Sequence, residues 1–361
     1  MALSLVPKLG AQRIKLLLEW VDHPREIFRM SRSQLKRLQS IGPATADNIV
    51  KFNEWDKVDE IIHKTERIGA QIITLADEVY PDRLRQIYDP PLLLWVKGNP
   101  GALNKDGIAV VGTRRASSYG KKQAEYFSEA LVEQGLSVIS GLAYGIDSVA
   151  HKTTVKKHGT TIAVLGSGID VIYPSVNAEL ANQIAETGGA VISEFPLGTK
   201  PDAMNFPVRN RIVSGMSMGT LVIESGREGG SMITAKSALD QNREVFVIPH
   251  RLGHINGEGC NYLIKSAQGK LVQHIDDILN EISFKRKKKS GQPRQYKHNW
   301  KNEELDETAE KICRLLEKGP HHVDDLSEKL EIQTHELLSS LLTLEMLNCV
   351  DQKAGKIFEL K

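Results

Sequence analysis

The stretch that decides the fold runs Ile108-Ala-Val-Val111-Gly112-Thr113-Arg114-Arg115. An apolar run that stops at glycine, a hydroxyl and two cations predicts a buried strand that enters a surface loop. Further runs, separated by helical segments, lie at 136–139, 161–165, 190–193, 220–223, 244–248 and 270–273. Such alternation is typical of βαβ units. We therefore expect an α/β protein whose Rossmann-like domain, residues 75–283, holds six or seven parallel strands.

The segment before this domain has helical spacing. Residues 1–74 predict a small helix-hairpin-helix or SAM-like domain, because Leu35 to Ile49 resembles a hairpin whose turn presents backbone N–H groups to a phosphate. Ser40 stands at the usual first glycine and Ala44 where a basic residue is common. The hairpin therefore either binds DNA weakly or packs on a neighbouring surface.

Two further segments follow the Rossmann-like domain. Residues 284–302 predict a solvated basic linker, a tether that would touch DNA only non-specifically. The apolar positions of residues 303–361 predict three helices and a short hairpin, which together form a winged helix. Its third helix should begin near Gln333 and carries no lysine or arginine ahead of its apolar face. Because phosphate contacts need cations, a protein contact or dimer role is favoured here over direct DNA binding.

The composition is that of a soluble globular protein, with 40% hydrophobic and 25% charged residues. No apolar run reaches the roughly 18 residues of a membrane span, so we expect no membrane segment and a cytoplasmic location. Cys260, Cys313 and Cys349 are too widely spaced for a disulfide framework or a zinc site, and we expect free thiols and no metal. The net charge of +2 is small, so a polyanion would have to be met by a local patch.

The loops after the first five strands predict such a patch. They contain glycines, hydroxyls and cations: Gly112-Thr113-Arg114-Arg115, Ser140-Gly141 with Gly145, Gly166-Ser167-Gly168, Gly198-Thr199-Lys200 and Ser225-Gly226-Arg227. In a parallel sheet such loops meet at the carboxyl edge, where helix N-termini converge. Five of them fit a long polyanion better than a single nucleotide. The alternative is that the glycines only shape strand-to-helix turns.

The segment Phe206-Pro207-Val-Arg209-Asn210-Arg211 opens a helix with an aromatic residue and two arginines. An exposed Phe206 would stack a base while the cations hold the flanking phosphates, as in single-strand binders. The alternative is a buried Phe206 beside salt-bridged arginines.

We expect no enzyme activity and no cofactor, because the usual catalytic arrangements do not occur. The chain has no GxxxxGK[ST] loop, and the loop at Gly166 lacks the third glycine of a dinucleotide fingerprint. Glu224, at the end of the fifth strand, is the one carboxylate placed like a catalytic acid. It would serve in the alternative function, that of a LOG-like nucleotide phosphoribohydrolase. The PGGxGT arrangement of those enzymes does not occur here.

Seven segments together resemble the DNA-processing protein A (DprA/Smf) family. They are 111–114, 140–151, 163–174, 192–198, 206–215, 231–235 and 259–264. The resemblance implies a Rossmann-type homodimer that binds single-stranded DNA, protects incoming DNA and loads RecA recombinase in natural transformation. Thr113 and His250 depart from the family pattern, and Arg227-Glu228-Gly229 has the look of an insertion. None of these departures removes a cation.

The resemblance also implies which residues contact DNA. The loops would form a pocket for the DNA backbone, three helix and loop cations would extend it, and Phe206 would stack a base. The expected contacts are Gly112, Thr113, Arg114, Arg115, Ser140, Gly141, Gly145, Gly166, Ser167, Lys200, Phe206, Arg209, Asn210 and Arg211. A scaffold in which only the flanking domains act is a third hypothesis, which the density of cations along one edge disfavours.

Overall fold

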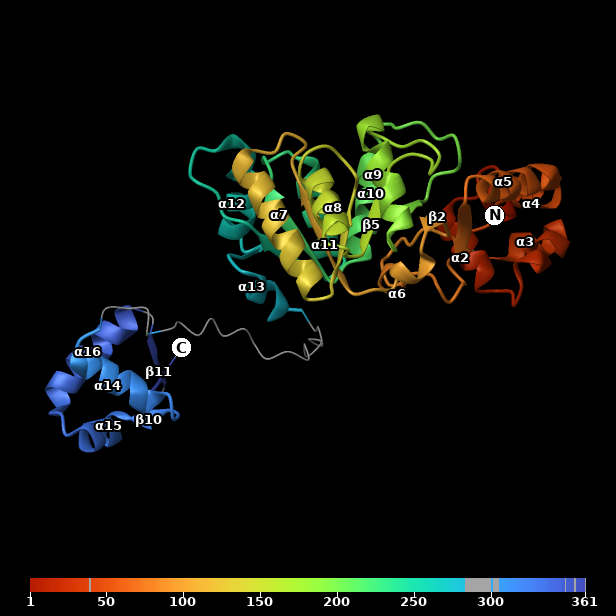
Figure 1. Cartoon of the computed structure of the whole chain (residues 1–361). Coiled ribbons are helices and arrows are strands. Elements are labelled where there is room, and N and C mark those ends of the chain that lie inside the picture. Colours follow the sequence, from red (N-terminus) through yellow and green to blue (C-terminus); the bar gives the residue numbers. More distant parts are fainter. Residues whose placement is uncertain (39, 283–299, 301–304, 348, 354, 361) are drawn as a thin grey trace. The chain divides into compact units, whose positions relative to one another are not determined.

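The computed structural model describes residues 1–38, 40–282, 300, 305–347, 349–353 and 355–360. These residues form two compact units, 1–282 and 300–360 (Figure 1). The predicted basic linker 284–302 lies outside the described residues except for Trp300. The finer division into 1–74, 75–283, 284–302 and 303–361 stays a prediction.

A nine-stranded sheet forms the centre of the larger unit, in the order β1-β2-β6-β5-β4-β3-β7-β8-β9. The seven predicted runs are all strands. They are adjacent in the sheet, and each pairs in parallel with the other members of the seven that lie next to it. They are β3 (Gly107–Gly112), β4 (Ser137–Ser140), β5 (Thr161–Leu165), β6 (Ala190–Ser193), β7 (Gly219–Glu224), β8 (Glu244–Val247) and β9 (Lys270–Leu271). The Rossmann-like sheet expected from the sequence is therefore confirmed.

Two strands at one edge were not predicted. β1 (Ala70–Thr74) and β2 (Leu93–Gly98) pair antiparallel with each other, and β2 pairs antiparallel with β6. Antiparallel edge strands do not belong to a βαβ repeat, so the alternation of strands and helices gives no signal for them. β1 also follows its preceding helix after only two residues, inside the segment where the sequence pattern predicts helices.

Helices cover both faces of the sheet (Figure 1). Ile108 and Val110 of β3 face α7, α8 and α13, whereas the alternate residues Ala109 and Val111 face α10, α11 and α12. α9 packs on the first face beside β5 and β6. The bounds are α6 (Asp82–Arg85), α7 (Ser118–Glu133), α8 (Ile146–Lys156), α9 (Ala178–Glu186), α10 (Asn205–Gly215), α11 (Gly230–Asp240), α12 (Glu258–Lys265) and α13 (Ile275–Leu279). Single 3-10 turns lie at η2 (Pro100–Ala102), η3 (Ser175–Asn177) and η4 (Ile255–Gly257).

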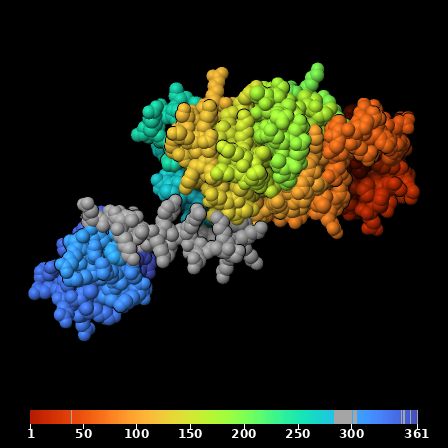
Figure 2. Space-filling model, viewed as in Figure 1, coloured from red at the N-terminus to blue at the C-terminus, as the bar shows by residue number. Residues whose placement is uncertain are grey.

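The N-terminal helices pack next to the β1–β2 edge, where Figures 1 and 2 show them in red and orange. They are α1 (Ala2–Leu5), α2 (Ala11–Leu18), η1 (Pro24–Arg29), α3 (Arg32–Arg37), α4 (Pro43–Val50) and α5 (Trp55–Arg67). In the α3–α4 hairpin Ser40 has a φ of 70°, in the left-handed region that favours glycine. The backbone thus keeps the turn even though serine replaces the usual glycine.

The smaller unit is a winged helix, as predicted. Its helices are α14 (Glu307–Leu316), α15 (Val323–Leu330) and α16 (Thr334–Met346), and its strands β10 (His321–His322), β11 (Val350–Lys353) and β12 (Ile357–Leu360) pair in the order β10-β12-β11. α16 begins next to Gln333 and contains no lysine or arginine. Leu338 and Leu342 of this helix are exposed.

Three general features bear on function. No helix in the described part of the chain is long and apolar enough to cross a bilayer. Over the same residues, no group of three or more His, Cys, Asp or Glu side chains could hold a metal ion. The side chains of Cys260, Cys313 and Cys349 are all buried.

Candidate nucleic-acid interface

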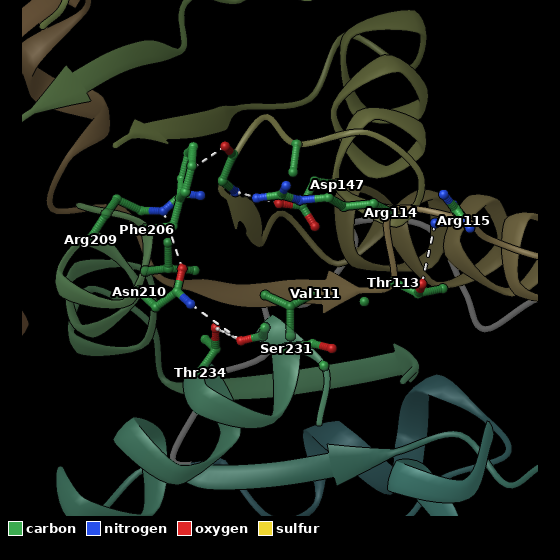
Figure 3. A pocket seen from close by; sticks show the side chains of 16 residues that line it. Val111, Thr113, Arg114, Arg115, Asp147, Phe206, Arg209, Asn210, Ser231 and Thr234 are labelled. Carbon is green, nitrogen blue, oxygen red and sulfur yellow. Dashed lines mark hydrogen bonds between the residues drawn. The ribbon is translucent and has the colours of Figure 1, made fainter. Parts of the chain in front are cut away.

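The loops after β3, β4 and β7 meet the first turns of α10 and α11 around a pocket of about 360 Å³ (Figure 3). The pocket lies at the carboxyl edge of the sheet, where the sequence pattern predicts it. Its lining residues are Val111, Gly112, Thr113, Arg114, Arg115, Gly141, Ala143, Asp147, Phe206, Arg209, Asn210, Val213, Gly229, Gly230, Ser231 and Thr234. Three arginines against one aspartate leave the lining with a net positive charge, which suits an anionic ligand.

The loop after β3 is held by backbone contacts on both sides. The N–H of Thr113 donates to the carbonyl of Glu224 at 2.7 Å, and the carbonyl of Thr113 accepts from the N–H of Ile146 at 3.3 Å. Gly145, with a φ of 78°, lies so close to the carbonyls of Thr113 and Arg114 that a Cβ would collide with both. The loop backbone is therefore fixed, while the side chains of Arg114 and Arg115 stay exposed.

Arg114 and Phe206 form an arginine–aromatic pair at the mouth of the pocket. The guanidinium carbon of Arg114 lies 5.0 Å from the centroid of the Phe206 ring, and Figure 3 shows the two side chains approaching from opposite sides. Phe206 is half-buried, because its ring packs against Gly166, where a Cβ would come within 2.8 Å of it. Neither alternative from the sequence holds fully: the ring rests on the protein and still reaches the surface.

A second hollow of about 490 Å³ shares four residues with the first pocket, namely Arg114, Phe206, Asn210 and Gly230. Tyr173, Pro201, Ala203, Pro207 and Ile233 complete its lining. The Tyr173 ring lies 5.8 Å from that of Phe206 and is 39% exposed. Lys200 is exposed next to Pro201. The two hollows together extend the anion-binding site along the edge of the sheet.

Arg209 lines the pocket floor but is buried, with 4% of its surface exposed. It donates to the carbonyl of Gly141 at 2.6 Å and to that of Val164, and its Nε donates to Asn210 Oδ1 at 3.2 Å. Burial lowers its pKa to about 10, a shift opposed by the nearby charge of Asp147. Asp147 is buried too, and burial raises its pKa. Arg209 therefore holds the loop after β4 and the end of β5 together from within.

Six expected contact residues lie outside the lining of the first pocket: Ser140, Gly145, Gly166, Ser167, Lys200 and Arg211. Ser140 and Ser167 are buried and donate their hydroxyl protons to the carbonyls of Val110 and Val171, both at 2.6 Å.

Arg211 is committed to carboxylates. Its guanidinium lies 2.6 Å from Glu194 and 3.0 Å from Asp89. Burial raises the pKa of Glu194, with Arg211 opposing the shift. Although Arg209 and Arg211 look alike in the sequence, neither presents a free cation to the pocket.

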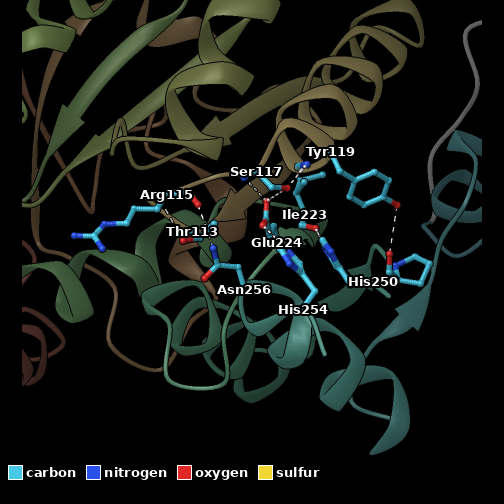
Figure 4. A network of polar contacts seen from close by, with 11 residues as sticks. Thr113, Arg115, Ser117, Tyr119, Ile223, Glu224, His250, His254 and Asn256 are labelled. Atoms are coloured by element: carbon cyan, nitrogen blue, oxygen red, sulfur yellow. Dashed lines mark hydrogen bonds and ion pairs between the residues drawn. The ribbon is translucent and has the colours of Figure 1, made fainter. Parts of the chain in front are cut away.

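Glu224 lies behind the loop after β3, which carries Arg114 and Arg115, and does not line the pocket (Figure 4). Its carboxylate is 0% exposed, accepts from the N–H and the hydroxyl of Ser117, both at 3.0 Å, and lies 2.9 Å from His254 Nε2. From the same loop, Asn256 donates to the carbonyl of Arg115 at 3.3 Å. These contacts brace the loop after β3. The hydrolase alternative needs this carboxylate beside its substrate, but Glu224 lines neither the first pocket nor the second hollow.

The buried His151 is expected to make the stability of the larger unit depend on pH. Burial lowers its pKa to about 3, and the charge of Arg209 adds to the shift. In the unfolded chain the His151 imidazole takes up a proton near pH 6.5, whereas in the folded chain it stays neutral down to about pH 3. The free energy of unfolding therefore keeps its full contribution from His151 above about pH 6.5. This contribution falls by about 1.4 kcal/mol for each pH unit between about 6.5 and 3. We expect the difference in unfolding free energy between wild type and His151→Asn to shrink from pH about 7.5 to about 5.5. Urea unfolding measures it, and a constant difference would contradict the assignment.

Several residues of the site were not expected from the sequence. The two hollows are lined in part by Tyr173, Ser231 and Thr234, and the loop after β3 is supported by Asn256. Asp147 lies in the first turn of α8, where it accepts from the N–H of Gly141 at 3.0 Å, and the charge of Arg209 opposes the rise in its pKa. Its place in the first turn of a helix that follows a glycine-rich loop is the one signal for it.

Fold and site together define a class: a Rossmann-like sheet protein with an arginine–aromatic pocket for an anionic ligand at the carboxyl edge, followed by a winged helix. The family model of DNA recombination-mediator protein A matches residues 71–283, and the chain belongs to that family. The DprA winged helix domain matches residues 300–356.

Known relatives support this assignment. Protein Smf of Escherichia coli K12 is 44% identical over 220 residues, which are 61% of this chain and 58% of that protein. The X-ray structure of DNA processing protein A from Streptococcus pneumoniae is 33% identical, with a TM-score of 0.68 over 79% of this chain and 97% of that one. A second structure, of the Helicobacter pylori protein and its single-stranded DNA binding mode, is 29% identical, with a TM-score of 0.53 over 58% of this chain and 94% of that one.

Proposed function

We propose that the chain binds single-stranded DNA along the carboxyl edge of its sheet. The observation that carries the proposal is the pair of Arg114 and Phe206, 5.0 Å apart at the mouth of the pocket. Among the described residues, Arg114, Arg115 and Lys200 form no ion pair and are exposed, so they are free to meet phosphates. Cations that follow the backbone and an aromatic ring that stacks a base are the usual means of holding a single strand.

A single strand fits this site better than a duplex. A base can stack on Phe206 or on the plane of Arg114 only when its face is exposed, and in a duplex both faces are covered by neighbouring bases. The two hollows, of about 360 and 490 Å³, lie side by side along the edge and so suit successive nucleotides. The single-stranded DNA binding mode of DNA processing protein A from Helicobacter pylori supports the same ligand for this chain.

Phe206→Leu tests the stacking contact. Leucine keeps an apolar side chain over Gly166 but removes the ring, so we expect affinity for a labelled oligo-dT to fall about five- to tenfold. Phe206→Tyr keeps the ring and should bind like wild type. Fluorescence anisotropy measures both. Equal affinities of Phe206→Leu and wild type would exclude Phe206 as a stacking residue.

We further infer that the bound strand is protected and passed to RecA recombinase during natural transformation, by a cytoplasmic homodimer. Membership in a family of recombination mediators supports this step. The rate at which RecA assembles on oligo-dT covered by a single-strand-binding protein measures it: we expect acceleration by wild type. The absence of any acceleration by a chain that binds the strand would refute the loading role.

A further inference from the structure

A third hollow, of about 550 Å³, borders the loop after β7, which also contributes to the lining of the first pocket. Arg227 from that loop, Leu252 and Gly253 from the loop after β8, and one side of α12 line it. The lining on α12 consists of Glu258, Asn261, Tyr262, Lys265 and Ser266. None of these residues belongs to the first two hollows. Arg227 lies in the segment that looks inserted relative to the family pattern.

Arg227 and Tyr262 repeat the arrangement of Arg114 and Phe206. The guanidinium carbon of Arg227 lies 4.5 Å from the centroid of the Tyr262 ring, and both residues are exposed, Tyr262 by 38%. Two other arginine–aromatic pairs occur in the described part of the chain, and each has a buried member: Arg85 lies over the fully buried ring of Tyr80, and the buried Arg209 lies 6.0 Å from the ring of Phe206. Two pairs thus present their planar groups to solvent, and both lie at loops on the carboxyl edge.

The third hollow also has suitable charge. In the described structure neither Arg227 nor Lys265 forms an ion pair, and both side chains are exposed. Glu258 is the one acidic residue of the lining, so the net charge of the hollow is +1. Leu252, which is 93% exposed, adds an apolar edge. Cations suit the phosphate of a nucleotide, and an aromatic ring with an apolar edge suits the flat face of its base.

The position of this hollow continues that of the first pocket. Arg227 lines the third hollow and Gly229 the first, and their Cα atoms are at most about 7.6 Å apart because only two peptide links separate them. The N–H of Gly229 donates to the carbonyl of Gly226 at 3.2 Å. The turn from Gly226 to Gly229 therefore connects the linings of the two hollows.

The turn is also anchored to α12. The N–H of Gly259 donates to the carbonyl of Ser225 at 2.8 Å, and a Cβ at Gly259 would come within 2.5 Å of the carbonyl oxygen of Gly226. This close contact places the first turn of α12 against the loop, and Tyr262 follows one turn later on the same helix. The stack of Arg227 on Tyr262 is therefore formed before any ligand binds.

We propose that the third hollow is a further nucleotide subsite, where a base of the single strand stacks on the outer plane of Arg227 while Tyr262 holds that plane from behind. The subsite rests on the proposed function, because it takes the same strand that Arg114 and Phe206 bind. It lengthens the binding site by the nucleotides that lie beyond Gly229.

The test compares oligo-dT of about four nucleotides, which fills the first pocket, with oligo-dT of about sixteen, which can cross the turn. For Arg227→Ala and for Tyr262→Ala we expect anisotropy titrations to show a five- to tenfold loss of affinity for the long oligonucleotide, about the value of one stacked base, and none for the short one. Tyr262→Phe should restore wild-type affinity. Tyr88→Ala, at a tyrosine that is 86% exposed and outside all three hollows, is the matched control.

The outcomes separate this proposal from the proposed function. If Arg114→Ala weakens both lengths while Arg227→Ala and Tyr262→Ala weaken neither, the subsite is refuted and the main site stands. If the Arg227 and Tyr262 variants weaken both lengths equally, the hollow is no separate subsite. If wild type binds neither length, both proposals fail. Because Arg227 is an exposed loop residue, Arg227→Ala keeps the test valid even if Tyr262→Ala unfolds.

Discussion

Replacing Arg114 by alanine is expected to weaken binding of oligo-dT about 10- to 100-fold, whatever the base sequence. The side chain is exposed, forms no ion pair among the described residues and stacks on Phe206, so its loss removes a phosphate contact and uncovers one face of the ring. The slope of log affinity against log salt should fall by about 0.7, the value for one phosphate on a single strand. Anisotropy titrations over a range of salt concentrations measure both effects.

Arg67→Ala is the matched control for this variant, because Arg67 is an exposed arginine at the end of α5 and lines neither hollow at the carboxyl edge. It should bind like wild type. Arg114→Ala should also melt at the wild-type temperature, since nothing in the described core depends on its guanidinium. Unchanged affinity of Arg114→Ala at moderate salt would contradict the placing of the site.

Arg209→Ala is expected to destabilise the larger unit by about 3–5 kcal/mol, the cost of removing one of two opposite charges that are buried near each other. The substitution leaves the buried Asp147 without its cation and removes the donor from the carbonyls of Gly141 and Val164. Chemical denaturation near neutral pH, followed by circular dichroism, measures the loss. Loss of folded protein would in turn reduce DNA binding at any salt concentration.

The comparison with Arg114→Ala makes this prediction specific. The two arginines line one pocket, yet one substitution should change binding without stability and the other should change stability first. Arg209→Lys keeps the charge but cannot donate in the fork geometry of a guanidinium, so it should fall between wild type and Arg209→Ala. A wild-type unfolding midpoint for Arg209→Ala would show that Arg209 is not the internal support described here.

The different environments of Arg209 and Arg211 were partly predictable from the sequence. Arg209 precedes Ile212 and Val213 by three and four positions, so the three share one face of α10, and that face is buried against the sheet. Arg211 lies off that face, and its partner Glu194 comes from the end of β6, which no local pattern connects with α10. Spacing along a helix thus predicts burial, whereas ion pairs between distant segments need the fold.

The glycine-rich loops illustrate the same limit. Their position at the carboxyl edge follows from the parallel strands, and the structure places the pocket there. What the loops make room for could not be predicted: Gly141 admits the guanidinium of Arg209, and Gly166 admits the ring of Phe206. At these two positions the glycines make room for side chains of the protein itself. They therefore shape the pocket only indirectly, through Arg209 and Phe206.

The most direct test of single-strand binding is a titration of the wild-type chain onto labelled oligo-dT of about sixteen nucleotides and onto a duplex of equal length. Both titrations are made at about 50 mM and about 200 mM salt, a range over which phosphate contacts lose much of their strength. We predict tighter binding of the single strand at both salt concentrations and weaker binding of both ligands at the higher one. Equal or tighter binding of the duplex, or affinity that does not respond to salt, would contradict the proposed site.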